Sequence, residues 1–433
     1  MDEEYESIVE KAKSILEKYP LCDRCLGRMF AGLGYGWSNK ERGDALKRVL
    51  VMELHRAVRE GGEAEEEEFK KIAPNIGSQA SGLYEKLTGR RLEPRECAIC
   101  GGRLDSFIEE AAVKARGLLK AYDISRYVVG ARVDPGVEEA ERRIREEFGL
   151  AYGESIRAEI RREIGKRLMS DDTRPDFSDP EATVLVHFPS GRIELQVNSL
   201  LLRARYWKKA RYISQAYWPS PEGPRYFSVE QAAWGLLRVT GAERLVLHAA
   251  GREDVDARML GSGRPAIIEL KVPRRRRLSL SELEEAANRE GRGLVEFRIE
   301  GLASRREVRL YKQDYSKTRK VYKALVAFSD PSATDRLGEL EEFFRDRVVL
   351  QRTPRRVLHR RPDRLRRRRV YGVSCRPLER GVVECLIEAE GGLYVKELVS
   401  GDAGRTSPSF ASVLGVNAEC VELDVLLVEH GGF

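Results

Sequence analysis

Residues 251–256, with the sequence GREDVD, are the part of the chain whose residue types most clearly suggest chemistry. They follow an apolar run at 245–247 that is typical of a buried strand. A turn at the end of a strand can hold a carboxylate rigidly and still leave it open to a substrate, which makes Asp254 a candidate catalytic acid. Arg252 precedes it by two residues and could bind a phosphate or the carboxylate itself. Most turns of this composition are only turns, so the assignment needs support from elsewhere in the chain.

Four of the seven cysteines form two Cys-x-x-Cys pairs, Cys22 with Cys25 and Cys97 with Cys100. Each pair places two thiolates on one tight turn, where both can reach one tetrahedral ion. Residues 26–96 separate the pairs, which is more than a zinc ribbon usually has, so the ion would join the start of the chain to a later segment. A redox pair would need only one such motif at a helix start, and unrelated thiols are the other alternative. We expect structural Zn²⁺.

The other three cysteines lie in strand-like runs. Disulfides are disfavoured in a cytosolic chain, so we expect Cys375, Cys385 and Cys420 to be small buried apolar residues. The chain has only five histidines, scattered along its length, which argues against a catalytic metal site built from histidine.

Two further segments contain residues that could act on a substrate. Residues 320–326, KVYKALV, alternate so that Tyr322 and Ala324 share one face of an expected strand. Residues 394–398, YVKEL, follow two glycines and place Lys396 and Leu398 on another expected strand. Each segment also has an ordinary interpretation, since strand tyrosines usually pack in cores and strand lysines usually face water.

The composition fits a soluble protein of two or three domains. The chain has 433 residues, of which 42% are hydrophobic and 34% charged. No apolar run approaches the roughly 20 residues that span a membrane, and the acidic N-terminus is unlike a signal peptide. We therefore expect a cytoplasmic location and no membrane partner.

The net charge of +7 is unevenly distributed. Ten of the eighteen residues at 352–369 are arginine, and residues 274–277 are four more. Such density repels itself unless something anionic lies across it, and neither run has the apolar face of a membrane-surface helix. Nucleic acid is the expected partner, with a solvated basic surface as the alternative.

The hydrophobic pattern predicts an α+β multidomain chain. Residues 1–106 form the zinc-binding region, residues 107–205 form an α/β module, and residues 206–433 form an α+β domain on a mixed or antiparallel sheet. Residues 208–211, KKAR, could begin a linker. The principal expected elements are helices at 3–19, 40–60, 107–121, 137–147, 154–169, 228–239 and 279–289, and strands at 127–133, 183–188, 192–203, 244–248, 266–272, 294–299, 307–311, 320–328, 382–389 and 420–429.

The three chemistry-bearing segments together resemble the pseudouridine synthase superfamily. GREDVD at 251–256 is similar to the catalytic-aspartate turn, close to the GRTD form of TruA-type enzymes. KVYKALV at 320–326 is similar to the K-x-Y-x-A-x-V strand of RluA-type enzymes. YVKEL at 394–398 is similar to the Y-I-R-S-L element of TruB-type enzymes, and the order of the three is the superfamily's order.

More narrowly, the chain resembles the Pus-ten family of tRNA pseudouridine synthases. The resemblance rests on LCDRCLGRMF at 21–30, the paired cysteine motifs, the α/β module before residue 205, and GREDVDARMLGSGRPAIIEL at 251–270. It spans essentially the whole chain. It implies a zinc-binding region, a THUMP RNA-binding module and a C-terminal catalytic domain.

The resemblance also implies roles for individual residues. Asp254 would be the nucleophile, and Tyr322 would stack on the uracil and help to remove the C5 proton. Lys396 would keep Asp254 ionised through an ion pair, and Leu398 would pack beneath the base. Arg252 would support the turn or a phosphate.

Asp256 is the rival nucleophile within the same turn. The superfamily places the acid two residues after the arginine, which favours Asp254, and Asp256 could instead point away or cap the turn. The reaction breaks the N-glycosidic bond, rotates the uracil and joins C5 to C1′. It needs no organic cofactor, and the sequence leaves open whether the acid attacks directly or assists a glycal route.

The implied substrate is the TΨC loop of tRNA, at uridine 54, uridine 55 or both, with no obligate protein partner. The enzyme must extract its uridine from folded RNA, which suits the basic runs. One alternative is a non-catalytic zinc and THUMP protein that binds tRNA. Another is a THUMP-linked methyltransferase, but Arg264-Pro265 after the glycines at 261 and 263 precludes the helix start that its nucleotide site needs.

Overall fold

The chain folds into two compact units, residues 1–198 and 199–433, and each is described by itself. The computed structural model describes residues 7–219, 223–249, 251–313 and 318–429. The boundary that we predicted, between residues 205 and 206, falls inside strand β5 (Leu200–Lys208). This strand pairs with two others of the second unit, and β4 (Arg192–Val197) ends before it, where a single strand at 192–203 was expected.

Helix α1 of the N-terminal unit begins at a well-formed cap. Ser7 precedes α1, and its hydroxyl accepts from the amide of Glu10 while the Glu10 carboxylate accepts from the amide of Ser7. Residues 3–6 of the helix predicted at 3–19 lie outside the described residues. The helical elements of this unit are α1 (Ile8–Lys18), α2 (Asp23–Met29), α3 (Asn39–Gly61), α4 (Glu63–Ile76), η1 (Ser78–Ala80), α5 (Ser81–Thr88), α6 (Leu104–Ala121), α7 (Pro135–Glu147) and α8 (Ile156–Leu168).

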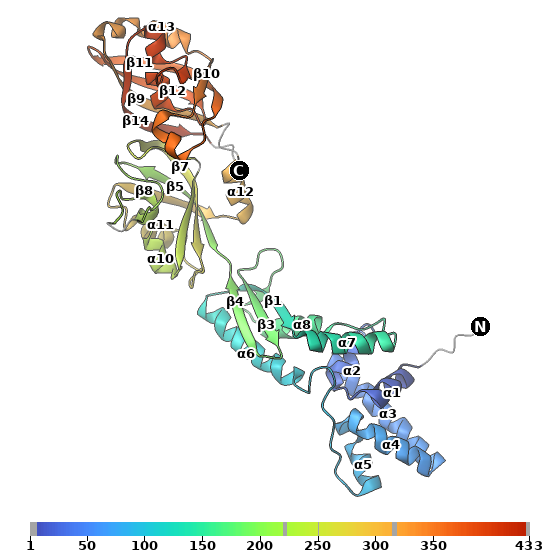
Figure 1. Cartoon of the computed structure of the whole chain (residues 1–433). Helices are drawn as coiled ribbons and strands as arrows, with labels where there is room; N and C mark the ends of the chain where they lie inside the picture. The colour runs from blue at the N-terminus through green and yellow to red at the C-terminus, as the bar shows by residue number, and fades with distance from the viewer. Residues whose placement is uncertain (1–6, 220–222, 250, 314–317, 430–433) are drawn as a thin grey trace, which may run out of the picture. The chain divides into compact units, whose positions relative to one another are not determined.

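A four-stranded sheet completes the N-terminal unit, in the order β2-β1-β3-β4. Its members are β1 (Arg126–Val133), β2 (Arg174–Pro175), β3 (Ala182–Phe188) and β4, and only β3 and β4 pair antiparallel. Helices α6 and α8 contact the sheet, and the helices α1 to α5 lie towards the N-terminus (Figure 1). One apolar core extends from α1 to β3, so the regions predicted at 1–106 and 107–205 are packed together.

Buried ion pairs link α2 to the following module. Arg28 is fully buried, and its guanidinium donates to Glu141 on α7 at 2.8 Å and to Glu159 on α8 at 2.9 Å. Arg24 donates to the same Glu159 at 3.1 Å. Buried charges are tolerated only when each has a partner, so these contacts fix α2 against α7 and α8.

The C-terminal unit is built on one mixed sheet, ten strands in its described residues, in the order β13-β10-β11-β12-β9-β14-β7-β5-β8, with β6 pairing β7. Strands β7 and β14 are parallel neighbours, and the other pairs are antiparallel. The predicted mixed sheet is therefore confirmed. Besides β5, its strands are β6 (Arg244–Ala249), β7 (Arg258–Lys271), β8 (Val295–Leu302), β9 (Arg319–Phe328), β10 (Arg347–Arg352), β11 (Leu365–Glu379), β12 (Val382–Glu390), β13 (Thr406–Ser407) and β14 (Ala418–Val428).

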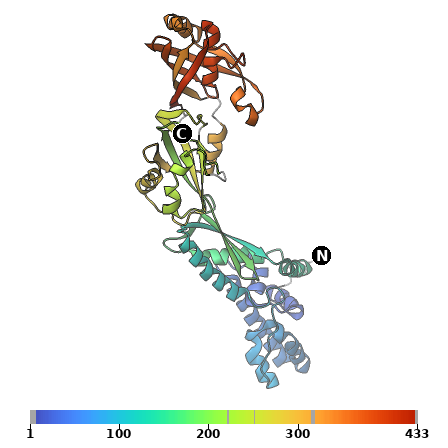
Figure 2. The same cartoon turned by 60° about the vertical axis from the view of Figure 1, so that its left-hand side comes forward.

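Short helices cover this sheet, as the two views of Figures 1 and 2 show. Helices α10 and α11 pack together beside β8, whereas α13, α14 and α15 pack together against β11 and β14. The helical elements are α9 (Val229–Ala232), α10 (Gly235–Thr240), α11 (Leu280–Asn288), α12 (Arg305–Gln313), η2 (Pro331–Arg336), α13 (Leu337–Phe343), η3 (Arg355–Arg360), α14 (Val395–Ser400) and α15 (Phe410–Leu414).

Two segments predicted as strands are helices. Residues 307–311 lie in α12, because Ser304 and Glu307 exchange side-chain to backbone hydrogen bonds and so cap a helix start. Residues 395–398 lie in α14, which ends at Gly401 in the left-handed conformation, with φ of 80°.

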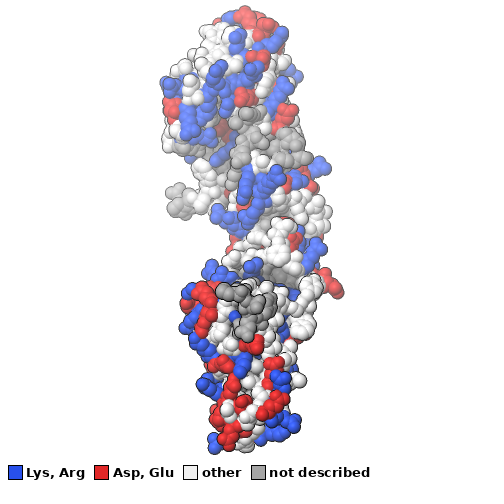
Figure 3. Space-filling view, turned by 90° about the vertical axis from the view of Figure 1, so that its right-hand side faces the viewer, with Lys and Arg blue, Asp and Glu red and all other residues white. Residues whose placement is uncertain are grey.

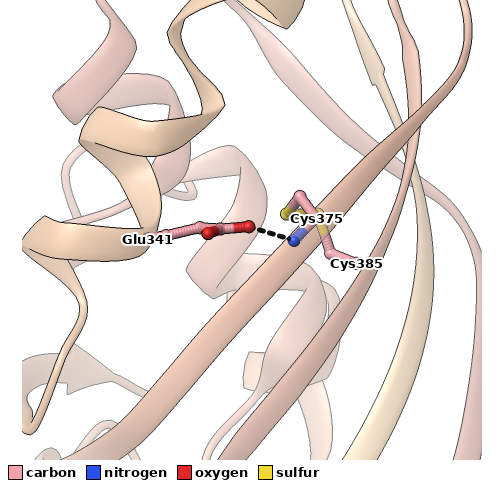
Figure 4. Close-up of a disulfide and its surroundings, with 3 residues drawn as sticks. All are labelled: Glu341, Cys375 and Cys385. Atoms are coloured by element: carbon pink, nitrogen blue, oxygen red, sulfur yellow. Dashed lines mark hydrogen bonds between the residues drawn. A yellow bond between two sulfur atoms is a disulfide. The ribbon is translucent and has the colours of Figure 1, made fainter.

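Two cysteines expected to be unpaired form a disulfide. Cys375 on β11 lies directly opposite Cys385 on β12 in the antiparallel register, which brings their sulfur atoms together. The amide of Cys375 donates to the carboxylate of Glu341 on α13 at 2.6 Å (Figure 4). Cys420 is a free thiol, but it is only partly buried, where a buried residue was expected.

Among the described residues, none of the helices has both the length and the apolar character that crossing a bilayer requires.

Candidate active site

The turn at 251–257 connects β6 to β7 and borders a cavity of about 950 Å³. Gly251 has a φ of 75°, a conformation that glycine adopts without strain, and the amide of Ala257 donates to the carbonyl of Asp254 at 3.1 Å. Asp254 lines the cavity with its side chain 34% exposed. The turn thus presents a carboxylate that solvent or a substrate can reach.

Cationic side chains dominate the lining of this cavity. Among the described residues that line it, Glu253 and Asp254 carry carboxylates. The basic residues in the lining are Arg225, Arg252, Arg264, Lys320, Arg356, Arg361, Arg366, Arg368 and Lys396. An excess of positive charge in a cleft attracts a polyanion.

The two aspartates of the turn have different cationic partners. The guanidinium of Arg356 lies 2.9 Å from the carboxylate of Asp254, and Nζ of Lys396 lies 2.5 Å from that of Asp256. The pairing predicted for Lys396 with Asp254 is therefore not the one observed. Burial opposes ionisation of Asp256, but its hydrogen bond from Lys396 lowers its pKa below the usual value.

The geometry of α14 explains why Lys396 pairs with Asp256 and not with Asp254. Glu397 is buried, and its carboxylate accepts from Nε of Arg356 at 2.7 Å. The neighbouring Lys396 points elsewhere on the helix, towards Asp256. Arg356 lies within the arginine run at 352–369, and nothing in that run singles it out by sequence.

Tyr322 on β9 lines the same cavity and is 8% exposed. Its neighbours across the sheet are Ile387 and Val425. Burial raises the pKa of Tyr322 to about 12, with the charge of Asp254 adding to the effect and that of Arg264 opposing it. The phenol is therefore neutral near pH 7 and can donate a hydrogen bond.

Leu398 does not lie where a base-supporting residue was predicted. It is fully buried in the core and does not line the cavity. In a helix, residues two positions apart point in nearly opposite directions, so Lys396 and Leu398 cannot both face a substrate. Leu423 and Val425 on β14 supply apolar lining instead.

Arg252 is exposed and lines the cavity. Its guanidinium lies over the ring of Trp218, 5.4 Å from the ring centre, in a cation–π contact. Trp218 also lines the cavity, so the two residues form one polar and aromatic wall.

A buried polar layer lies behind the turn. The carboxylate of Glu253 accepts from Nε of Arg264 at 2.8 Å and from the hydroxyl of Tyr206 at 3.1 Å. Burial and, to a smaller extent, the nearby charge of Arg264 together lower the pKa of Lys320 to about 8. The sequence did not predict this layer, because Tyr206, Arg264 and Lys320 come from three separate strands and meet Glu253 of the turn only in the fold.

The four cysteines of the N-terminal unit converge. Their sulfur atoms all lie within 4.8 Å of one another, and those of Cys22 and Cys100 are 3.6 Å apart. A tetrahedral ion with bonds of about 2.3 Å to sulfur requires sulfur–sulfur distances of about 3.8 Å. Gly101 and Gly102 have φ of 58° and 71°, which turns the backbone around the second pair. The cluster fits a metal ion of tetrahedral preference.

The chain is similar to known proteins over nearly its whole length. The family model described as "Pus10, C-terminal" matches residues 201–429, and "Pus10 THUMP domain, archaeal" matches residues 111–187. An Aeropyrum pernix protein named tRNA pseudouridine synthase Pus10 is 60% identical over 426 residues, which cover 98% of each chain. An Ignisphaera aggregans protein of the same name is 42% identical over 429 residues, covering 98% of this chain and 99% of that one.

A solved structure of a Cbf5-Nop10-Gar1 complex contains a chain that is 18% identical, with 53% of this chain and 48% of that chain covered. Its TM-score of 0.29 is too low to support an argument about this fold. The matches to the family models and to the full-length relatives show that this chain belongs to the Pus10 family of tRNA pseudouridine synthases, which are isomerases.

Proposed function

We propose that this protein converts uridine to pseudouridine in the TΨC loop of tRNA, with Asp254 as the catalytic acid. The observation that carries the proposal is the position of Asp254. Its carboxylate stands at the tip of a braced turn, in a cationic cavity that also holds Tyr322. Family membership supplies the reaction class and the tRNA substrate.

The reaction balances without an organic cofactor. The bond between N1 of uracil and C1′ of the ribose breaks, the base rotates, and C5 bonds to C1′. C5 then loses its proton while N1 gains one. Asp254 either attacks the nucleoside directly or assists loss of the C2′ proton along a glycal route, and both need a single ionised carboxylate at this place.

The neighbouring residues take complementary roles. Tyr322, buried and neutral, stacks on the flipped uracil and helps to transfer the C5 proton. Lys396 acts on the turn through Asp256, and Arg356 holds the carboxylate of Asp254. We assign the apolar support of the base to Leu423, in place of Leu398, because Leu423 lines the cavity.

The cavity suits a nucleotide drawn out of a folded RNA loop. Flipping exposes the target base and places its flanking phosphates against the protein. Arg252 with Trp218, and the arginines 361, 366 and 368, offer cations and an aromatic face at this place. In the view of Figure 3, Lys and Arg side chains gather over the C-terminal unit, whereas acidic and basic side chains alternate over the N-terminal unit.

Within this proposal the targets are uridine 54, uridine 55 or both, and the four cysteines hold a structural Zn²⁺. Zinc would join the helix that follows Cys22 to the turn at Cys97 and contribute directly to folding of the N-terminal unit. The THUMP domain would bind tRNA outside the catalytic cavity.

The test is to map pseudouridine in an unmodified tRNA transcript after incubation with the purified protein. New pseudouridine in the TΨC loop is expected from the wild-type protein and none from Asp254→Asn, which retains the shape of the side chain. Asp256→Asn is the matched control and should keep measurable turnover. Turnover by Asp254→Asn would remove this residue from its role, and tRNA binding without product would favour a non-catalytic tRNA-binding protein.

A further inference from the structure

The backbone carbonyls of the Asp254 turn are held by side chains from one short segment, residues 208–215. This segment begins at the last residue of β5, and its first four residues, 208–211, were expected to begin a linker. Lys208, Arg211 and Gln215 each donate to carbonyl oxygens of residues 251–256. A linker does not need side chains that bind one turn, so these contacts indicate a different role for the segment.

Lys208 makes the central contacts. Its Nζ donates to the carbonyls of Ile213 at 2.9 Å, Asp254 at 2.9 Å and Val255 at 3.2 Å. These three acceptors match the three N–H donors of an ammonium group. The side chain is buried, and the carboxylate of Glu253 lies 3.9 Å away as its counter-charge.

The other two residues hold the ends of the turn. Nε2 of Gln215 donates to the carbonyl of Gly251 at 3.0 Å and to the hydroxyl of Tyr206 at 2.9 Å. The guanidinium of Arg211 donates to the carbonyl of Asp256 at 3.0 Å and to that of Leu423 at 2.8 Å. Arg211 thus joins the turn to the strand that supplies apolar lining of the cavity.

The energetics favour a dedicated arrangement. A buried ammonium is costly unless its donors are satisfied and its charge is compensated. At Lys208 three carbonyls accept from Nζ and the Glu253 carboxylate lies 3.9 Å away, and these contacts offset part of the effect of burial, which lowers the pKa of Lys208 to about 8. The same bonds restrict the peptide groups on both sides of Asp254. Within the turn itself there is one backbone hydrogen bond, from the amide of Ala257 to the carbonyl of Asp254. The additional bonds from side chains restrain the backbone further, and a restrained backbone keeps the Asp254 carboxylate in one direction.

We propose that Lys208, together with Arg211 and Gln215, is a positioning residue that aims the Asp254 carboxylate into the cavity. The proposal rests on the function proposed above. Lys208 acts through the backbone of the nucleophile and does not contact the substrate. A displacement of about 1 Å at a reacting group can reduce a rate by roughly 100-fold, so the expected defect lies in turnover and not in tRNA affinity.

Lys208→Met is the principal variant, because it keeps the length of the side chain and removes its donors. Lys209→Met is its matched control. Lys209 is the adjacent residue but is 50% exposed and pairs with Glu296, away from the turn. The measurements are the single-turnover rate of pseudouridine formation at saturating tRNA, the Kd for tRNA, and the unfolding temperature.

We expect the Lys208→Met rate to fall by about 100-fold with a Kd within twofold of the wild-type value, and Lys209→Met to match the wild-type protein. Gln215→Leu removes one donor without leaving an uncompensated charge, so it serves where Lys208→Met does not fold. We expect about a tenfold loss of rate for Gln215→Leu at unchanged Kd.

Wild-type rates in folded Lys208→Met, or in Gln215→Leu where Lys208→Met is unfolded, would overturn the proposal. Equal losses of rate and affinity, or an equal defect in Lys209→Met, would also overturn it, because they indicate general disruption. Absence of pseudouridine with the wild-type protein itself would instead refute the proposed function, so the two failures are distinguishable.

Discussion

Arg356 and Asp254 form an ion pair of 2.9 Å, and this pair connects the arginine run to the turn at 251–257. The same guanidinium is held from behind by the buried Glu397. The cation nearest to the proposed nucleophile therefore comes from η3, and Lys396 pairs with the other aspartate of the turn, Asp256. The two aspartates of the turn thus have separate partners, Arg356 for Asp254 and Lys396 for Asp256.

Arg356→Met should lower the turnover rate by about tenfold. The variant removes the charge-assisted hydrogen bond that orients Asp254. Because both groups are partly exposed, the free energy of this bond lies at the lower end of the range for charged hydrogen bonds. Arg356→Lys should recover part of the rate. Arg355→Met, at the exposed neighbouring position, is the control. The measurement is the single-turnover rate, and a full rate for Arg356→Met would contradict this role.

Tyr322 should not titrate within the working range of the enzyme. Burial raises its pKa to about 12, so the phenol keeps its proton from neutral pH up to about pH 10. Any loss of activity between pH 8 and pH 10 must come from another group, and Tyr322→Phe should lower the rate without changing the shape of that part of the profile. The pH–rate profiles of both proteins provide the check. A basic limb that vanishes in Tyr322→Phe would assign that limb to the tyrosine.

Cys97→Ser should release the metal ion and destabilise the N-terminal unit. A structural zinc site contributes its binding free energy to folding, so one lost thiolate should lower the unfolding temperature of this unit by several degrees or more. Metal content and thermal unfolding are the measurements, with Cys420→Ser, a free thiol outside the cluster, as the control. A stable variant that retains its metal would refute the assignment.

Replacing Arg361 and Arg366 together with glutamine should flatten the salt dependence of tRNA binding. Both line the cavity, and each phosphate contact contributes about 0.7–0.9 to the slope of log Kd against log salt concentration. The slope should fall by about 1.5 in total. The matched double variant Arg289→Gln and Arg345→Gln removes two exposed arginines of the same unit that pair with nearby glutamates, Glu285 and Glu342. An unchanged slope for the cavity variant would leave these arginines without a role in binding.

The sequence predicted the general architecture and the acid turn, because both depend on local patterns. Alternation and charge placed Asp254 after β6 and Tyr322 on β9. The partner of Lys396 could not be predicted, since it depends on whether 395–400 is a helix, and YVKEL is compatible with a strand. The role predicted for Leu398 was wrong for the same reason, because the side chain points into the core only when this segment is a helix.

The contacts between residues 208–215 and the turn could not be predicted for a different reason. Lys208 follows a run of alternating residues and precedes Lys209, so the pair resembles the basic start of a linker. Its burial depends on where β5 lies in the sheet, between β7 and β8. Pairing over such sequence distances leaves no mark in a local pattern. The disulfide between Cys375 and Cys385, which are only ten residues apart, was missed for another reason, because the expected cytosolic location argued against any disulfide.

The guanidinium of Arg28 is fully buried, and this burial limits where the chain can be cut into fragments that fold. A fragment that begins at residue 107 would keep Glu141 and Glu159 but lose the cations that neutralise them. The THUMP domain therefore cannot be exchanged between relatives as a free-standing cassette unless its two glutamates change with it. The cysteine region and the THUMP domain are expected to be inherited, and to tolerate substitution, as one body.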